Sequence, residues 1–335
     1  MLAGVGASAV LAGAVLAPVA VTNAQVERQA TSLAGAVDAA LAGEAPCFGA
    51  AAVFGDEAGS CADSHVVRDD YSPTAAAEDT QNNFLLARGE EDPTFRRECA
   101  RVPDSVIERC DVGQDTGGGV MVVVGDSHAD HLMTPLAAIA ARHDMAVVEV
   151  RRWSCRPVLP LFASPLEAEA DGTCVAWKSQ MVDYVASLDA RVVVTSGAAQ
   201  GYGDLPPELD AEIVSAYQQT WQPWLETGAP LLVISDVPRW DVAVPLCVEL
   251  GSGSDPCTRP RGEVVVEDLA MTAAASVDAP GLGVVDLYPA FCDDDTCHAV
   301  VGGVITHRDS NHLTSTFAAS LAPRIEQGLL DLGAF

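Results

Sequence analysis

Short runs of β-favouring apolar residues alternate with longer segments of helical spacing along the chain after residue 119. The expected strands cover residues 121–124, 145–150, 192–195, 231–235 and 283–287. The expected helices cover residues 129–142, 174–188, 207–226 and 313–330. Because strands that alternate with helices are joined by right-handed crossovers, this order predicts a parallel sheet with helices on both faces. We therefore expect an α/β fold, a three-layer α/β/α sandwich around a mostly parallel, flavodoxin-like sheet.

The chain before this alternating region has a different composition. Residues 1–26 carry no charged side chain and are long enough to form a membrane helix. No basic segment precedes them, as one would in a secretory signal, so two interpretations remain: the last membrane helix of a longer protein, or an atypical signal cleaved near Ala24. The expected divisions are a membrane or signal segment at 1–24, a helical linker at 25–46, a disulfide-containing N-terminal extension packed on the core at 47–119, and the main domain at 120–335.

Charge and cysteine content restrict the partners and the compartment. A formal net charge of −29 argues against nucleic acid or an anionic membrane surface as a partner. The ten cysteines include no Cys-x-x-Cys pair and no zinc-type cluster with histidine, so we expect no metal site. Their even number, in an acidic chain with an export segment, indicates an oxidising compartment. Connectivity stays open at this stage, but pairing between neighbours needs the least rearrangement and would join Cys47 with Cys61, Cys99 with Cys110, Cys155 with Cys174, Cys247 with Cys257, and Cys292 with Cys297.

A serine stands directly after the first expected strand, in the turn Gly125-Asp126-Ser127. Open α/β sheets place their chemistry at the carboxyl ends of the strands. Ser127 would lie just ahead of the helix at 129–142, where free N–H groups favour a developing oxyanion, so we expect a serine nucleophile. The alternative is an ordinary turn in which the serine hydroxyl caps the helix.

A second motif, Asp309-Ser310-Asn311-His312, lies just before the last expected helix. A carboxylate three residues before a histidine can accept a hydrogen bond from the imidazole Nδ1–H, which directs Nε2 toward a nucleophile as general base. The alternative is that Asp309 helps to cap the helix and that His312 is a surface residue. Taken together with Ser127, the two motifs predict a Ser-His-Asp triad.

On these residues the chain resembles the SGNH (GDSL-like) hydrolase superfamily. The first block of that superfamily is similar to Gly125-Asp126-Ser127-His128, and its last block is similar to Asp309-x-x-His312. The GDSH form of the first block and the many cysteines are most similar to the extracytoplasmic SGNH domain attached to membrane acyltransferase-3 proteins, which O-acylate cell-surface glycans. The resemblance extends over roughly residues 47–330, with its sharp motifs at the two ends.

The middle blocks of the superfamily, which supply a glycine and an asparagine to the oxyanion hole, are not matched here. The loop after the second strand is Arg152-Trp153-Ser154-Cys155, and the loop after the third contains Ser196-Gly197-Ala198. Losing one oxyanion donor can raise a barrier by about 3–4 kcal/mol, so slow or unusual hydrolysis would be consistent with this sequence. The candidate oxyanion and substrate residues are Gly125, Asp126, His128, Trp153, Ser154, Ser196, Gly197 and Arg239, the last being equally consistent with an exposed loop arginine.

The resemblance implies an extracytoplasmic, membrane-anchored enzyme that needs no cofactor. It would transfer acyl groups to hydroxyls of a cell-surface glycan, with an acyltransferase-3 membrane domain, on the same or a separate chain, as partner. One alternative is a carbohydrate acetylesterase, in which water is the acceptor of the same chemistry. Another is a catalytically silent glycan-binding module, which would account for the unmatched middle blocks.

Overall fold

The computed structural model describes residues 31–54, 61, 65–159, 173–202, 206–253, 255–277 and 279–335. The expected membrane or signal segment at 1–24 lies outside these residues. Within the described ranges, none of the helices combines the length and the apolar character that a bilayer crossing requires.

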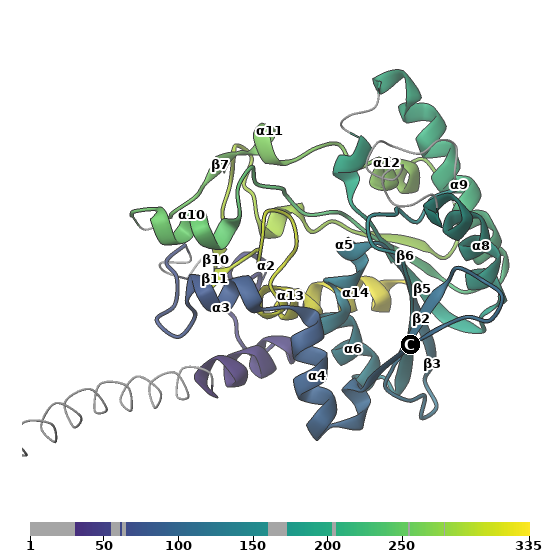
Figure 1. Cartoon of the computed structure of the whole chain (residues 1–335), viewed down its shortest axis with the longest axis horizontal. Coiled ribbons are helices and arrows are strands. Elements are labelled where there is room, and N and C mark those ends of the chain that lie inside the picture. The colour runs from purple at the N-terminus through teal and green to yellow at the C-terminus, as the bar shows by residue number, and fades with distance from the viewer. Residues whose placement is uncertain are drawn as a thin grey trace, which may run out of the picture.

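Seven strands form one sheet in the order β1-β2-β4-β3-β5-β6-β8 (Figure 1). The strands are β1 (Arg97–Arg101), β2 (Glu108–Val112), β3 (Gly119–Gly125), β4 (Met145–Arg151), β5 (Ala190–Ser196), β6 (Leu231–Ile234) and β8 (Leu282–Val285). Strand β2 runs antiparallel to β1 and β4, and every other neighbouring pair is parallel. The five parallel strands have the flavodoxin-like order 2-1-3-4-5, which confirms the predicted mostly parallel sheet.

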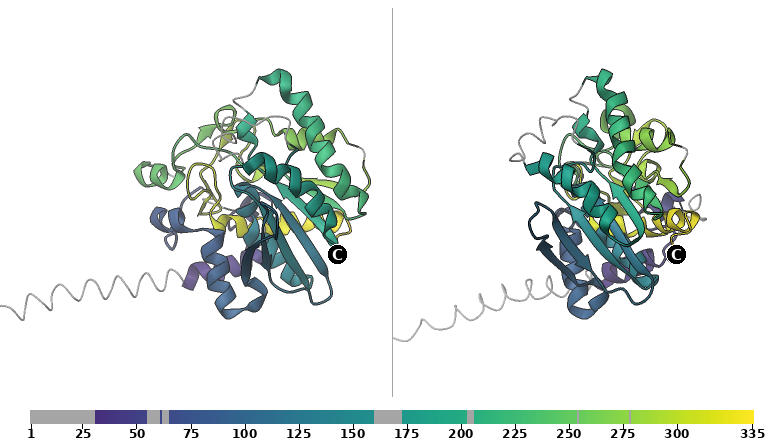
Figure 2. Two further views of the ribbon diagram at one scale, coloured as in Figure 1. Left: turned by 45° about the vertical axis from the view of Figure 1, so that its right-hand side comes forward. Right: turned by 90° about the vertical axis from the view of Figure 1, so that its right-hand side faces the viewer.

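Helices cover both faces of the sheet, because successive residues of a strand point to opposite sides. Met121 and Val123 join one hydrophobic cluster, whereas Val122 and Val124 join the other. The first face packs against α6 (Met133–Arg142), α13 (Ser315–Ala319) and α14 (Ala322–Asp331). The second packs against α8 (Thr173–Ser187), α9 (Asp210–Glu226) and α12 (Leu269–Ala275). The three-layer sandwich is thus as predicted, and Figure 2 shows it from two further sides.

Two of the expected helices are each divided in two. The helix predicted at 129–142 is α5 (Ser127–Asp130) followed by α6, and the helix predicted at 313–330 is α13 followed by α14. Pro135 and Pro323 lie in the first turns of α6 and α14. Proline has no N–H to donate to the preceding turn, so each one ends the continuous hydrogen-bond ladder where the division occurs.

The N-terminal extension, for which the sequence pattern predicts no strand or helix, contributes strands to the sheet. Its described residues include three helices and the β1–β2 hairpin, in which Cys99 lies directly opposite Cys110. The hairpin escaped the sequence pattern because charged residues occupy both of its faces, as is common at sheet edges. Residues 31–41 are also helical. The other described elements are α2 (Ala51–Phe54), α3 (Pro73–Glu78), α4 (Gln81–Glu91), α10 (Val244–Leu250), α11 (Arg261–Val264), β7 (Arg259–Pro260), β9 (Thr296–Cys297), β10 (Val300–Val301) and β11 (Val304–Ile305), with short 3₁₀ turns at Pro93–Phe95, Ala199–Tyr202, Pro207–Leu209 and Tyr288–Ala290.

The extension also holds the C-terminal part of the chain. The Asp79 carboxylate accepts hydrogen bonds from the Tyr71 hydroxyl at 2.7 Å and from the Thr316 N–H at 3.0 Å. The backbone carbonyl of Asp79 accepts a third from the Ser315 N–H. In Figure 2 the yellow C-terminal helices accordingly lie beside the purple and blue N-terminal ones. All ten cysteines form disulfides, and they join the same five neighbouring pairs that sequential pairing predicts.

Replacing Gly125 by alanine should destabilise the sheet at the end of β3. A Cβ there would lie 2.2 Å from the Ser196 carbonyl oxygen and 2.4 Å from the Ala129 Cβ, so the neighbouring strand and α5 must move apart. We expect Gly125→Ala to lower the free energy of unfolding, measured by urea denaturation, by about 1–3 kcal/mol.

Gly35→Ala is the matched control, because Gly35 is an exposed helical residue with no atom within 4 Å of the added Cβ. This variant should be as stable as the parent or more stable by up to about 1 kcal/mol. Equal stability of Gly125→Ala and the parent protein would contradict the close approach of β3 and β5.

Candidate active site

The candidate nucleophile, Ser127, is the first residue of α5 at the carboxyl end of β3. The residue before it, Asp126, caps this helix, since its Oδ1 accepts from the His128 N–H at 2.8 Å. The sequence placed Ser127 ahead of a long helix, whereas the structure places it inside a helix of four residues. So short a helix aligns few peptide dipoles, which reduces the expected contribution of the helix to oxyanion binding.

Ser127 and His312 meet although 185 residues separate them, with 2.9 Å between the serine Oγ and His312 Nε2. The histidine lies on a loop that closes on itself, because the Arg308 N–H donates to the His312 carbonyl at 2.9 Å. Next to it, the Leu313 N–H approaches Nδ1 of the buried His131 at 3.4 Å. These two bonds fix the loop backbone on either side of the His312 side chain.

Asp309 lies on the far side of His312, with its Oδ2 2.8 Å from His312 Nδ1. The other oxygen accepts from the N–H groups of Asn311 at 2.9 Å and His312 at 2.8 Å. Burial opposes ionisation of this carboxyl, but its hydrogen bonds with His312 and Asn311 outweigh burial and lower its pKa below the usual range. Asp309 is therefore a carboxylate that can orient the imidazole and stabilise its protonated form.

A buried pair of His128 and Asp236 lies beside the Ser127–His312 contact. His128 Nδ1 is 2.5 Å from Asp236 Oδ1, and the His128 and His312 ring centroids are 5.1 Å apart. Burial lowers the pKa of His128, but the Asp236 carboxylate outweighs it and raises the pKa to about 9. His128 is thus a charged imidazolium at neutral pH. It was a candidate from the sequence; Asp236 was not, although its place at the end of β6 is where such residues occur.

The same carboxylates fix the loop after β5. Asp236 Oδ2 accepts from the Ala199 N–H at 2.7 Å, and Asp126 Oδ2 accepts from the Ala198 N–H at 3.0 Å. These two N–H groups are therefore already bonded and are poorly placed to serve a substrate. Gly197 stands close by, where a Cβ would lie 2.9 Å from Pro157, and the Ser196 hydroxyl is buried without a hydrogen-bond partner among the described residues.

The other sequence candidates lie on the surface of the same sheet edge. Ser154 is exposed and has a left-handed backbone, with φ at 56°, in the loop where the superfamily would have a glycine. Trp153 is 56% exposed, and the Arg151 guanidinium lies 4.7 Å above its ring. Arg239 is also exposed and donates to the Gln200 side chain at 3.2 Å.

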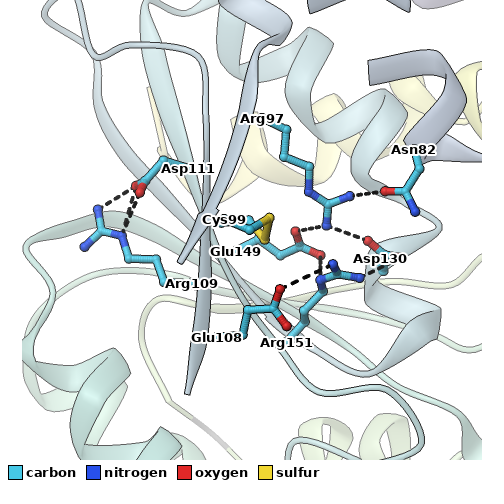
Figure 3. The surroundings of a disulfide bond; sticks show 10 residues. Asn82, Arg97, Cys99, Glu108, Arg109, Asp111, Asp130, Glu149 and Arg151 are labelled. Carbon is cyan, nitrogen blue, oxygen red and sulfur yellow. Dashed lines mark hydrogen bonds and ion pairs between the residues drawn. A yellow bond between two sulfur atoms is a disulfide. The ribbon is translucent and has the colours of Figure 1, made fainter. Parts of the chain in front are cut away.

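Sequence reasoning missed a charged network at the last residue of α5. Asp130 accepts from Arg97 at 2.8 Å, and Arg151 lies 3.4 Å away; both arginines also approach Glu149 (Figure 3). Burial opposes ionisation of Asp130, but Arg151 and Arg97 outweigh it and lower its pKa. Burial together with the charge of Asp130 raises the pKa of Glu149 to about 8. Ion pairs between residues so far apart in the chain cannot be predicted from a local sequence pattern.

Among the described residues, one cluster has metal-type donors. Ligand atoms of His65, Asp255 and His298 lie within 4.8 Å of one another, and His65 Nδ1 hydrogen-bonds to the Val300 carbonyl at 2.8 Å. A second group contains Cys99 and Cys110, whose sulfurs are joined to each other and are not free thiolates. The absence of a metal site thus stays a prediction.

Comparison with known proteins places this geometry in context. The sequence model of the SGNH domain (fused to AT3 domains) matches residues 94–327. The periplasmic domain of a lipopolysaccharide acetyltransferase from Salmonella ser. Paratyphi A is similar in structure, with a TM-score of 0.50 and 17% identity over 65% of this chain and 85% of that one. A second structure, the HSL homologue EstE7 from a metagenome library, reaches a TM-score of only 0.22 at 11% identity over 49% of this chain and 53% of its own. No curated protein sequence matches significantly.

The His128–Asp236 pair predicts a loss of stability in mild alkali. Its folded-state pKa of about 9 lies above the ordinary value of 6.5, so its contribution is fully present below pH 6.5 and is lost as the pH rises through about 9. The full contribution is on the order of 3 kcal/mol. Urea unfolding at a series of pH values should show this fall in the parent protein but not in the double variant His128→Gln, Asp236→Asn.

The variant His143→Gln is the control, because His143 pairs with Glu326 on the surface and should leave the fall unchanged. Identical pH profiles of the parent protein and the double variant would mean that His128 is neutral.

Proposed function

Because the chain belongs to the family of SGNH domains fused to AT3 domains, we propose that it transfers acyl groups through a serine nucleophile to hydroxyls of a cell-surface glycan. Family membership supports an esterase or acyltransferase. The observation that carries the finer proposal is the hydrogen-bonded chain from Ser127 through His312 to Asp309. It supplies a nucleophile, a general base and an orienting carboxylate in one line.

The proposed reaction has two acyl transfers. Ser127 Oγ attacks the carbonyl carbon of an acyl donor while His312 Nε2 takes the hydroxyl proton, and His312 returns that proton to the departing oxygen. In the second step a sugar hydroxyl gives its proton to His312 and attacks the acyl-serine, and His312 returns the proton to Ser127 Oγ as the serine leaves. Asp309, held ionised by its hydrogen bonds, stabilises the imidazolium in both steps.

The oxyanion of each tetrahedral intermediate needs hydrogen-bond donors beside Ser127. The Ser127 N–H, in the first turn of α5, is one proposed donor, since the first N–H groups of a helix have no intrahelical acceptor. The buried Ser196 hydroxyl is a second proposed donor, because it has no partner among the described residues and belongs to the last residue of β5, which pairs with Gly125. Gly197 and Ser154, which lie in the flanking loops, remain candidate oxyanion or substrate residues.

The family and the similar periplasmic domain support a proposal for the setting of this chain. We propose an extracytoplasmic location and an AT3 membrane domain as the partner that supplies the acyl group. The acetylesterase alternative keeps the same residues and differs only in the acceptor. The silent glycan-binding alternative is disfavoured, because a binding module gains nothing from a serine, a histidine and a carboxylate within hydrogen-bonding distance.

Ser127→Ala should remove covalent labelling by a fluorophosphonate and lower the hydrolysis rate of a small acetyl ester about a thousandfold or more, because the nucleophile is lost. The measurements are peptide mapping of the labelled chain and the steady-state rate. Ser179→Ala is the control, since the Ser179 hydroxyl lies exposed on α8 and bonds only to the Val175 carbonyl. Labelling that persists in Ser127→Ala, with the chain folded, would reject this serine.

The division of the acyl group between glycan and water shows whether the chain is a transferase or an esterase. With an acetyl ester as donor, an acyltransferase should form acetylated oligosaccharide at the expense of free acetate as the acceptor concentration rises, because both compete for one acyl-serine. Mass spectrometry of the glycan and titration of released acetate measure the ratio. Release of acetate alone, at every concentration and with every acceptor glycan, would favour the esterase.

A further inference from the structure

A cavity of about 520 Å³ opens at the sheet edge beside the Ser127 turn. Its walls come from the β1–β2 hairpin and from the end of β4, and include Arg101, Glu108, Arg151, Arg152 and Trp153. We infer that this cavity binds an anionic sugar unit of the acceptor glycan. The inference rests on the proposed acyl transfer and adds the chemical class of the acceptor.

The strand register places this cavity next to the candidate nucleophile. Arg101 pairs with Glu108, Glu108 with Arg151, and Arg151 with Gly125, so four strands carry one row of residues along the carboxyl edge of β3 and β4. With strands about 4.8 Å apart, the row ends about 14 Å from the Ser127 turn. A short oligosaccharide lying along the row would have one unit in the cavity and another at the serine.

A direct contact also connects the cavity to the helix that carries Ser127. Arg151, which lines the cavity, lies 3.4 Å from Asp130 at the other end of α5 (Figure 3). The Arg152 N–H donates to the Gly125 carbonyl at 3.1 Å. The cavity wall and the nucleophile are therefore parts of one rigid edge.

Trp153 gives this cavity a surface suited to a sugar ring. Its indole is 56% exposed, and the Arg151 guanidinium 4.7 Å above the ring restricts its rotation. A large, flat side chain of this kind, with an apolar face and polar neighbours, is typical of ligand sites. The C–H face of a pyranose can pack on it while the hydroxyls contact the surrounding charged groups.

The charged residues of the cavity favour an acidic sugar as the ligand. The chain as a whole has 47 acidic residues against 18 basic ones, yet the described residues that line this cavity include three arginines, of which Arg152 already bonds to Thr173, and a single glutamate. Asp130, Glu149 and Glu108 surround Arg151, but Arg101 forms no ion pair or hydrogen bond with any described residue. A free guanidinium favours a bidentate contact with a carboxylate or a phosphate, and both occur on sugars.

The neighbouring buried acids are neutralised within their own network and do not reach Arg101. Asp130 and Glu149 face Arg97 as well as Arg151, so two arginines balance the two acids. The raised pKa of Glu149, about 8, further reduces the negative charge at neutral pH. The Arg101 guanidinium, which none of these acids contacts, is therefore open to an incoming anion on a strongly acidic protein.

The test is isothermal titration of the full chain carrying Ser127→Ala, which prevents turnover. The probes are a galacturonic acid tetrasaccharide, a galactose tetrasaccharide of the same linkage, and that same galactose tetrasaccharide bearing one phosphate. We expect one or both anionic probes to bind about tenfold or more tightly than the neutral one, and binding to weaken with added salt. Which anionic probe binds more tightly identifies the carboxylate or the phosphate as the ligand group.

Arg101→Gln and Trp153→Ala, each added to Ser127→Ala, should weaken binding of the preferred probe about tenfold. The matched control is Arg109→Gln. Arg109 follows the cavity residue Glu108 on β2, so its side chain lies on the side of the hairpin away from the cavity, where it pairs with Asp111 (Figure 3). This variant should bind the probe as tightly as its parent. Circular dichroism of all variants verifies that each is folded.

Two outcomes overturn the inference: equal binding of neutral and anionic probes, or an equal effect of Arg101→Gln and Arg109→Gln. Fluorophosphonate labelling of the chain with Ser127 intact is read separately and decides the proposed function. Tight anionic binding without labelling would reject the acyl transfer and leave a glycan-binding cavity. Labelling without a preference for anionic probes would reject the cavity alone.

Discussion

The buried pair of His128 and Asp236 holds the active-site edge of the sheet together. Asp236 follows β6, its carboxylate bonds to His128 in the helix after β3, and its second oxygen accepts from Ala199 in the loop after β5. Its own N–H donates to Asp268 at 2.8 Å. Removing two charged groups from water is costly, and the cost is recovered only when both partners remain fully hydrogen-bonded. Both carboxylate oxygens of Asp236 are hydrogen-bonded, and together these bonds fix the ends of three strands at one point.

The helix that begins at Ser127 depends on this arrangement, since four residues are too few to form a helix alone. One side of the helix is held by Asp236 through His128, and its last residue, Asp130, is held by Arg97 and Arg151. Both anchors are tertiary contacts to distant strands. The direction of the serine hydroxyl is therefore set by buried charges on either side of it.

The parts of the fold that follow from periodicity were predictable, and those that follow from long-range charge were not. The valine-rich strands and their intervening helices define a parallel sheet, and the GDSH and Asp-x-x-His spacings identify the residues that meet at Ser127. The β1–β2 hairpin was missed because its charged strands have no apolar alternation. Asp236 was missed because 108 residues separate it from His128, and no local pattern encodes that pairing. Pro135 and Pro323 were visible, but the first turn of a helix tolerates proline, so the sequence could not decide between one helix and two.

The separation of 185 residues between Ser127 and His312 has a consequence for how activity appears during synthesis. A growing chain that has folded β3 and β4 already exposes the serine, but its hydroxyl stays an ordinary alcohol until the last loop arrives. That loop is followed by α13, whose first N–H groups bond to Asp79 in the N-terminal extension. Under the proposed mechanism, the serine is thus activated only when the C-terminal loop has met the N-terminal extension, and an incomplete polypeptide would not form an acyl-enzyme prematurely.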